Sequence, residues 1–309
     1  MRFLHFLVAL GCAVCAMHVE YAKAQGQRVE FTTPGSLSLS REGRFVDAPA
    51  EKVRGELYLP EGAGPFPAMV IAHGCGGVSG AERYWASALR AAGYAALIVD
   101  SFGPRGIDRT CENLTRLNAV RRVPDQYGAL KMLAADPRID RRRIFLMGMS
   151  HGGFTAVIAS NAWAKTRFGG ALGFRAFFPF YPLCSAHSPE RFTLSAPMRI
   201  HIGGGDDWTP AAHCTALVSD LKAKGLDAHV TIYEGALHSF DNPSVGPRRL
   251  LPNAQSYASC ATLRGPSILG PYDMKMLRRC TTTGVHVGYD RAVAERSRQN
   301  LLIELKQFD

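Results

Sequence analysis

A serine flanked by glycines is the residue whose setting most directly indicates chemistry. Residues 148–153 read Gly-Met-Ser-His-Gly-Gly, so Ser150 stands in a Gly-x-Ser-x-Gly pattern. The apolar run 144–147 precedes it, and a helical pattern follows it. A serine in that context sits on a sharp turn between a strand and a helix, where flanking glycines leave room for a strained backbone. Ser150 is therefore predicted to be a nucleophile.

A serine hydroxyl attacks only when a base takes its proton, so a histidine and a carboxylate should follow in the chain. His238 comes a short loop after the last predicted strand and is the expected base. Asp206 and Asp207 follow the predicted strand 198–202, and catalytic groups gather at this end of parallel strands. Asp206 is favoured because Asp207 lies nearer a predicted helix start, where it could simply serve the helix dipole. Both carboxylates could also be ordinary surface residues.

The negative oxygen formed during acyl transfer needs preorganised N–H donors. The first expected donor is the backbone N–H of His151, directly after the nucleophile. The second should come from the glycine-rich loop 73–77, where Cys75 is favoured over Gly76. A plain glycine turn is the alternative reading of this loop. Cys75 is not expected to be the nucleophile, because Ser150 already occupies the turn.

The elements around these residues alternate between strands and helices. Apolar runs predict strands at 55–60, 67–72, 94–99, 144–147, 174–178, 198–202 and 230–233. Helical spacing predicts helices at 81–92, about 124–135, about 152–161, from Pro210 to Gly225, and at the end of the chain. Thr209 is expected to cap the fourth helix, with Pro210 in its first turn. This alternation predicts an α/β fold with a mostly parallel central sheet and helices on both faces.

Composition narrows the possible functions. The chain has 309 residues, is 47% hydrophobic and carries a formal charge of +10. Its basic residues are scattered and form no block interleaved with aromatic residues, so nucleic-acid binding is not expected. No interior apolar run reaches the ~20 residues of a membrane helix. His201, Asp206 and Asp207 lack a clear ligand motif, so neither a metal nor another cofactor is expected.

The N-terminus predicts export. A basic start, an apolar run from Phe3 to Met17 and the sequence Ala-Lys-Ala at 22–24 indicate a signal peptide, 1–24, cleaved before Gln25. Lipoprotein processing at Cys12 is the rival. The expected location is periplasmic or secreted. Residues 25–309 are predicted to form one domain, in which the irregular segment 243–283 is an insertion before the last helix and a possible cap.

At this point the sequence resembles the dienelactone hydrolase family of the α/β-hydrolase superfamily over roughly residues 50–245 and the last helix. The motifs that carry the resemblance are Ile-Ala-His-Gly at 71–74, Asp-Ser-Phe-Gly-Pro-Arg-Gly at 100–106, the serine turn at 148–153, Gly-Asp-Asp-Trp-Thr-Pro at 205–210 and Gly-Ala-Leu-His-Ser-Phe at 235–240. The family places its acid four residues before the proline, which supports Asp206.

The resemblance implies metal-free cleavage of a small-molecule ester or lactone. Ser150 stands where the dienelactone-cleaving members have cysteine, and those enzymes are cytoplasmic, so the family name does not fix the substrate. Arg105 is a candidate for holding a substrate carboxylate, although it could instead pair with a nearby acid. Trp208 is a candidate wall of the substrate pocket. The alternatives are a peptidase of the prolyl-oligopeptidase type and a non-catalytic periplasmic binding protein on a hydrolase scaffold.

Six cysteines follow the predicted signal peptide, and an even number in an exported protein indicates disulfides. Cys184 and Cys214 both follow strands whose ends should lie side by side, which favours their pairing. Pairs 75–111 and 260–280 would complete the set. Free buried thiols are the alternative.

Overall fold

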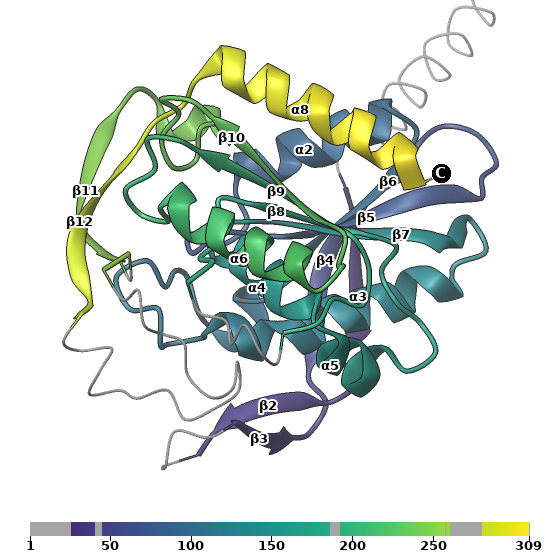
Figure 1. Cartoon of the computed structure of the whole chain (residues 1–309). Coiled ribbons are helices and arrows are strands. Elements are labelled where there is room, and N and C mark those ends of the chain that lie inside the picture. Colours follow the sequence, from purple (N-terminus) through teal and green to yellow (C-terminus); the bar gives the residue numbers. More distant parts are fainter. Residues whose placement is uncertain (1–25, 41–44, 186–191, 257, 260–279, 309) are drawn as a thin grey trace, which may run out of the picture.

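The computed structural model describes residues 26–40, 45–185, 192–256, 258–259 and 280–308. An eight-stranded sheet lies at the centre, in the strand order β1-β4-β6-β5-β7-β8-β9-β10 (Figure 1). Its strands are β1 (Gln27–Thr32), β4 (Lys52–Tyr58), β5 (Phe66–Ala72), β6 (Ala95–Asp100), β7 (Ile139–Met149), β8 (Phe177–Phe180), β9 (Met198–Gly203) and β10 (Ala228–Tyr233).

The sheet is mostly parallel. Strands β1 and β4 pair antiparallel with their neighbours, and the pairings from β6 to β10 are parallel. The central strands are apolar on both faces, as expected for a sheet covered by helices on both sides. Every residue from Ala68 to Ala72 in β5, for example, is buried.

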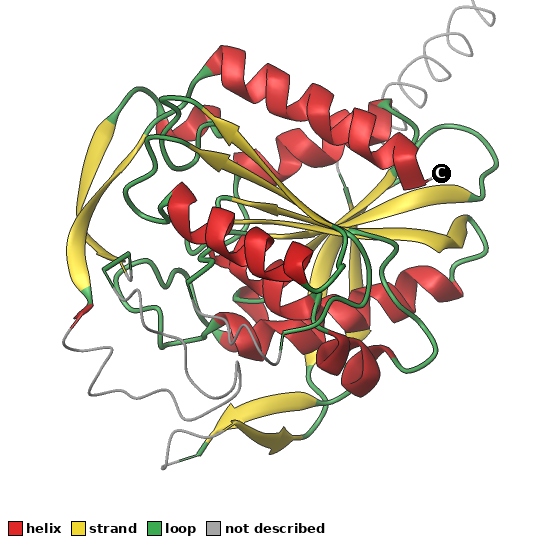
Figure 2. Ribbon diagram, in the orientation of Figure 1, coloured by secondary structure: helices red, strands yellow, loops and turns green. Residues whose placement is uncertain are grey.

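Helices cover both faces of the sheet (Figure 2). One face carries α2 (Gly80–Ala91) and α8 (Arg291–Leu305), and the other carries α3 (Val123–Ala135), α4 (His151–Ala159) and α6 (Ala211–Ala223). Short helical pieces are η1 (Gly103–Arg105), η2 (Ala119–Arg122), α5 (Ala162–Ala164), η3 (Lys165–Gly169), η4 (Pro243–Val245) and η5 (Lys306–Phe308). The predicted fold class is confirmed. No helix in the described part of the chain is long and apolar enough to cross a membrane.

Two antiparallel two-stranded sheets, here called ribbons, form separately from the central sheet. Strands β2 (Ser36–Leu39) and β3 (Phe45–Ala48) form one, and β11 (Arg249–Ser256) pairs with β12 (Thr282–Val287) in the other. The second ribbon shows that the irregular conformation predicted for 243–283 was wrong at both of its ends. The sequence of β11, Arg249–Ser256, contains a proline and shows no regular alternation, so local pattern did not predict this strand.

Helix α6 begins one residue later than predicted. Its N-cap is Pro210, which makes no side-chain capping hydrogen bond. The hydroxyl of Thr209 instead donates toward the Asp206 carboxylate, 2.9 Å away, and also lies 3.1 Å from the carbonyl of Tyr181. The capping role predicted for Thr209 was therefore wrong, because this hydroxyl belongs to the loop that holds the carboxylate.

Candidate active site

Ser150 occupies a strained turn between β7 and α4. Its φ of 54° and ψ of −113° are rarely adopted by a residue with a side chain. The glycines around it permit a close approach of neighbouring backbone. A Cβ added to Gly148 would lie 2.2 Å from the carbonyl oxygen of Gly152, and one added to Gly152 would lie 2.0 Å from that of Ala72. The turn therefore requires glycine at both positions.

His238 joins Ser150 to Asp206 through two hydrogen bonds. Its Nε2 lies 2.8 Å from the Ser150 Oγ, and its Nδ1 lies 2.8 Å from Oδ2 of Asp206. The carboxylate can only accept, so Nδ1 donates to Asp206 and Nε2 is left to accept the serine proton. The rings of Tyr181 and Trp208 each lie 4.7 Å from the imidazole between centroids. Packing and hydrogen bonding together fix the orientation of this buried ring.

The Asp206 carboxylate is held by its own loop. The backbone N–H groups of Trp208 and Thr209 donate to Oδ1 at 2.9 and 2.8 Å, and the Thr209 hydroxyl donates to Oδ2. These donors leave Oδ2 directed at His238, and the carboxylate is almost fully buried. Held in this way, the carboxylate orients the imidazole through Oδ2.

Asp207 points elsewhere. Its Oδ1 accepts from the backbone N–H of His286 at 2.9 Å, and its Oδ2 lies 2.7 Å from Nδ1 of the same histidine. His286 belongs to β12. The two adjacent carboxylates thus have separate tasks, since Asp206 contacts His238 and Asp207 ties down the β11–β12 ribbon.

The segments that carry the two predicted oxyanion donors both adjoin Ser150. His151 is the first residue of α4, so its N–H has no partner within the helix. On the other side, a Cβ built on Gly74 would lie 3.8 Å from the Cβ of Ser150, which places the loop 73–77 against the serine. Cys75 follows Gly74 in this loop. The loop that carries Cys75 therefore adjoins the nucleophile, and the roles of both donors stay predictions.

Cys75 is itself bridged to Cys111, as predicted, and the two Cα atoms lie 5.0 Å apart. The carbonyl of Cys75 also accepts from the N–H of Thr110 at 2.8 Å. A second predicted disulfide, Cys184–Cys214, is confirmed too. The third predicted pair, Cys260–Cys280, stays a prediction, because Cys260 lies outside the described residues.

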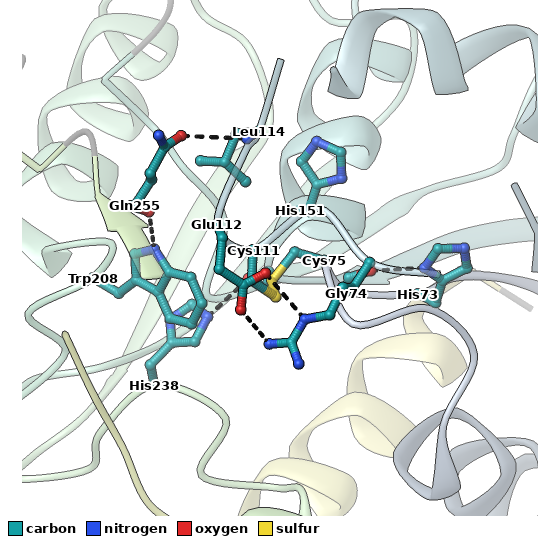
Figure 3. Close-up of a disulfide and its surroundings, with 12 residues drawn as sticks. His73, Gly74, Cys75, Cys111, Glu112, Leu114, His151, Trp208, His238 and Gln255 are labelled. Atoms are coloured by element: carbon teal, nitrogen blue, oxygen red, sulfur yellow. Dashed lines mark hydrogen bonds and ion pairs between the residues drawn. A yellow bond between two sulfur atoms is a disulfide. The ribbon is translucent and has the colours of Figure 1, made fainter. Parts of the chain in front are cut away.

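The β11–β12 ribbon packs on the Cys75–Cys111 disulfide. The carbonyl of Gln255 accepts from Nε1 of Trp208 at 2.8 Å, and the N–H of Gln255 donates to the carbonyl of Cys111 at 2.9 Å. Figure 3 shows Gln255 above Trp208 and His238, with the disulfide beside them. The N–H of Gly288 also donates to the carbonyl of His238, at 3.1 Å. The ribbon thus contacts the loops of the acid, the base and the predicted oxyanion donor.

Arg122 is a buried cation that the sequence analysis did not single out. Its Nη1 donates to Nδ1 of His151 at 2.9 Å, and its Nη2 donates to the carbonyl of His73 at 2.8 Å. Its guanidinium lies 5.1 Å from the centre of the Phe102 ring. Burial lowers the pKa of Arg122 to about 10. Nothing in the sequence indicated this role, because Arg121 and Arg122 appear in it only as a pair of arginines before a predicted helix.

Burial and the nearby Arg122 charge hold the pKa of His73 and that of His151 well below the usual value. Their hydrogen bonds agree with neutral rings. Nδ1 of His73 donates to the carbonyl of Gly74 at 2.7 Å, and its Nε2 accepts from the N–H of Ser101 at 3.3 Å. Neither ring contacts Ser150 in the way His238 does, so the structure singles out one histidine as the partner of the serine.

Arg105, the predicted substrate clamp, is engaged by carboxylates of the chain. Two of its nitrogens lie 2.9 Å from the oxygens of buried Asp125, and its Nε lies 2.7 Å from Glu51. A third contact joins it to the carbonyl of Ser101. These contacts match the structural alternative noted for this arginine, and none of them joins it to Ser150 or His238. Trp208, the predicted pocket wall, lies directly against His238.

Comparison with known proteins shows which family the sequence belongs to. The sequence model of the dienelactone hydrolase family matches residues 53–265. The chain belongs to the dienelactone hydrolase family. Members of this family are hydrolases of small-molecule substrates, so the chain is an enzyme that hydrolyses esters or related bonds. No group of three or more histidine, cysteine, aspartate or glutamate side chains in the described ranges is arranged to hold a metal.

Solved structures of the dienelactone hydrolase type share the fold. The dienelactone hydrolase of Anabaena variabilis has a TM-score of 0.52 and 23% identity, over 71% of this chain and 91% of its own. A dienelactone hydrolase-like promiscuous phosphotriesterase from metagenomic libraries has a TM-score of 0.58 and 16% identity, over 92% of this chain and 99% of its own. These likenesses concern the fold.

Among curated relatives, a thiohydrolase of Aspergillus aculeatus is 33% identical over 122 residues. The match covers 38% of this chain and 36% of the thiohydrolase, so it spans about a third of each protein.

Proposed function

We propose that the enzyme is a serine hydrolase that cleaves a carboxylic ester or lactone through an acyl-enzyme intermediate. The observation that carries the proposal is the hydrogen-bonded series from Ser150 through His238 to Asp206. It starts at a serine held with φ of 54° on the turn between β7 and α4. The three residues follow in the order serine, acid, histidine that this type of turn accompanies in other hydrolases.

Each group has a defined task in this mechanism. Nε2 of His238 takes the Ser150 proton as Oγ attacks the carbonyl carbon, and later passes a proton to the leaving alcohol. Asp206 keeps Nδ1 protonated and stabilises the imidazolium that forms. The backbone N–H groups of His151 and Cys75 donate to the oxyanion. Water then attacks the acyl-enzyme with His238 as base and releases the acid.

A thioester substrate is the second candidate. The similarity to the Aspergillus aculeatus thiohydrolase favours it, and the same serine mechanism applies to a thioester carbonyl. A thiolate leaves without needing its proton, so thioesters depend less on His238 as a general acid. The ratio of kcat/KM values for an ester and a thioester with one acyl group separates the candidates.

We place the mature enzyme outside the cytoplasm, as one domain from residue 25 onward. The two disulfides Cys75–Cys111 and Cys184–Cys214 support this, since structural disulfides persist in oxidising compartments. The predicted signal peptide, 1–24, lies outside the described residues. Mass spectrometry of the exported protein tests the proposed cleavage, with Gln25 as the expected first residue.

Hydrolysis of p-nitrophenyl esters from acetate to decanoate tests the proposed chemistry. The wild type should turn over, and its chain-length optimum should report the size of the acyl site. Ser150→Ala should lose turnover and fluorophosphonate labelling, whereas Ser244→Ala, which changes an exposed serine, should retain both. Equal labelling of the wild type and Ser150→Ala would refute the role of Ser150.

A further inference from the structure

A cavity lies apart from the serine. It has a volume of about 500 Å³ and is bounded by the start of β4, the segment from η1 to Ile107, and the stretch from Arg116 to η2. Its lining does not include Ser150, His238 or any of the proposed oxyanion donors. The volume falls within the ~300–1,000 Å³ typical of small-molecule sites.

The lining of this cavity is strongly cationic. Four basic side chains line it, namely Lys52, Arg105, Arg116 and Arg121. Glu51 is the one acidic side chain in the lining. Arg105 is already neutralised, because it contacts both Glu51 and the buried Asp125.

The other three cations keep their charge uncompensated. Nε of Arg121 donates to the carbonyl of Leu37, and Nη2 of Arg116 lies 3.4 Å from the carbonyl of Gly106. Within the described ranges, no carboxylate forms an ion pair with Lys52, Arg116 or Arg121. Glu51 is engaged elsewhere, since Arg105 contacts its Oε2 and the hydroxyl of Ser36 donates to its Oε1. Three like charges around one concavity repel each other, and a bound anion would relieve that repulsion.

The cavity also offers apolar surface. Pro104, Ile107 and Leu117 line it, and the accessible part belongs to Pro104 and Ile107, because Leu117 is almost fully buried. Inorganic ions would leave this surface in water, whereas an organic anion would cover it. The combination selects a ligand with an anionic head group on a compact apolar body.

We propose that this cavity binds a small organic anion, with its head group held by Lys52, Arg116 and Arg121 and its body against Pro104 and Ile107. A guanidinium can hold a carboxylate through two parallel hydrogen bonds, and a lysine adds a point charge. The site does not depend on the chemistry of Ser150, so it stands or fails separately from the proposed ester hydrolysis.

Calorimetric titration of the full chain with benzoate at low salt is the test. Benzoate should bind saturably with one-to-one stoichiometry, whereas benzamide, which has the same ring and no charge, should not. The double variant Lys52→Gln/Arg116→Gln should bind benzoate at least about tenfold more weakly, because each charged contact is worth roughly that factor. High salt should weaken binding in the wild type as well.

The matched control is Lys131→Gln/Arg142→Gln, which removes the same two charges from exposed positions outside the cavity. It should bind benzoate like the wild type. Both double variants alter exposed side chains, so their melting temperatures should stay close to that of the wild type, and Arg116→Gln alone repeats the test if one does not. Equal weakening by both double variants, equal binding of benzamide, or no saturable binding at millimolar benzoate would overturn the proposal.

Discussion

At the scale of single residues, Asp206 and Asp207 show how adjacent identical side chains acquire different tasks. Asp206 faces His238 because three donors of its own loop fix its oxygens, whereas Asp207 faces His286 on the ribbon. The sequence offered two equivalent carboxylates after one strand. Chain order and the spacing to the proline favoured Asp206, and the geometry agrees with that preference.

The pair gives a built-in comparison. Asp206→Asn should lower kcat by up to about 10⁴-fold, because an amide at this position favours the wrong tautomer of the histidine, as in the serine-protease triad. Asp207→Asn should change kcat far less, since it contacts only the ribbon. Steady-state kinetics on a single p-nitrophenyl ester measures both. Similar losses in the two variants would contradict the assignment of Asp206.

A second residue-scale prediction concerns acid stability. His73 and His151 have pKa values well below 6.5 in the folded state, because both rings are buried near Arg122. The unfolded chain therefore binds protons at these sites first as the pH falls. Full stability is expected above pH ~6.5, with a loss of up to about 1.4 kcal/mol per pH unit for each histidine below it.

Denaturant unfolding between pH 7 and 5 measures this slope. His151→Asn keeps the backbone N–H and an acceptor for Arg122, and it should reduce the slope by one histidine's share. Burial alone lowers the pKa of half-buried His213, which adds a smaller amount in the same direction. Because the variant and the wild type share their carboxyl groups, the difference between their slopes isolates His151. Identical slopes would contradict the prediction.

At the scale of elements, local pattern predicted most of the sheet and the helices on it. The apolar runs before Ser150, Asp206 and His238 are local features, and parallel strands bring their ends to one edge. Contacts between residues that only the tertiary fold brings together could not be predicted from local pattern. Arg105 meets Asp125 from α3 and Glu51 from the residue before β4, and the ribbon pairs 249–256 with 282–287 across a long intervening segment.

The disulfide between the oxyanion loop and Cys111 allows an element-scale prediction. Cys111→Ser should release the loop 73–77 and lower kcat by up to about 10²-fold, since one correctly placed donor is worth that much or more. Cys75→Ser keeps its own backbone N–H and should have the same effect, because it breaks the same bridge. Cys184→Ser is the control for the loss of a disulfide elsewhere. Activity equal to the wild type in Cys111→Ser would show that the loop holds its geometry unaided.

At the scale of the whole molecule, the two confirmed disulfides restrict the unfolded chain. They close loops with sequence separations of 36 and 30 residues. The chain-entropy relation gives about 4 kcal/mol for a loop of either length. Reduction should therefore shift the denaturant midpoint to a markedly lower concentration, as followed by fluorescence with and without dithiothreitol. An unchanged midpoint would mean that the bridges are not formed in the isolated protein.

The crowded turn around Ser150 has a consequence for the mutability of this enzyme. The backbone atoms that a Cβ at Gly148 or Gly152 would meet belong to the turn itself and to β5, so they cannot move aside as a flexible side chain would. A saturation library screened for ester turnover should return glycine alone at both positions, whereas exposed Lys131 on α3 should accept nearly every replacement. Evolution toward new substrates would then have to change the surrounding loops and leave the glycines of the turn at 148–153 intact.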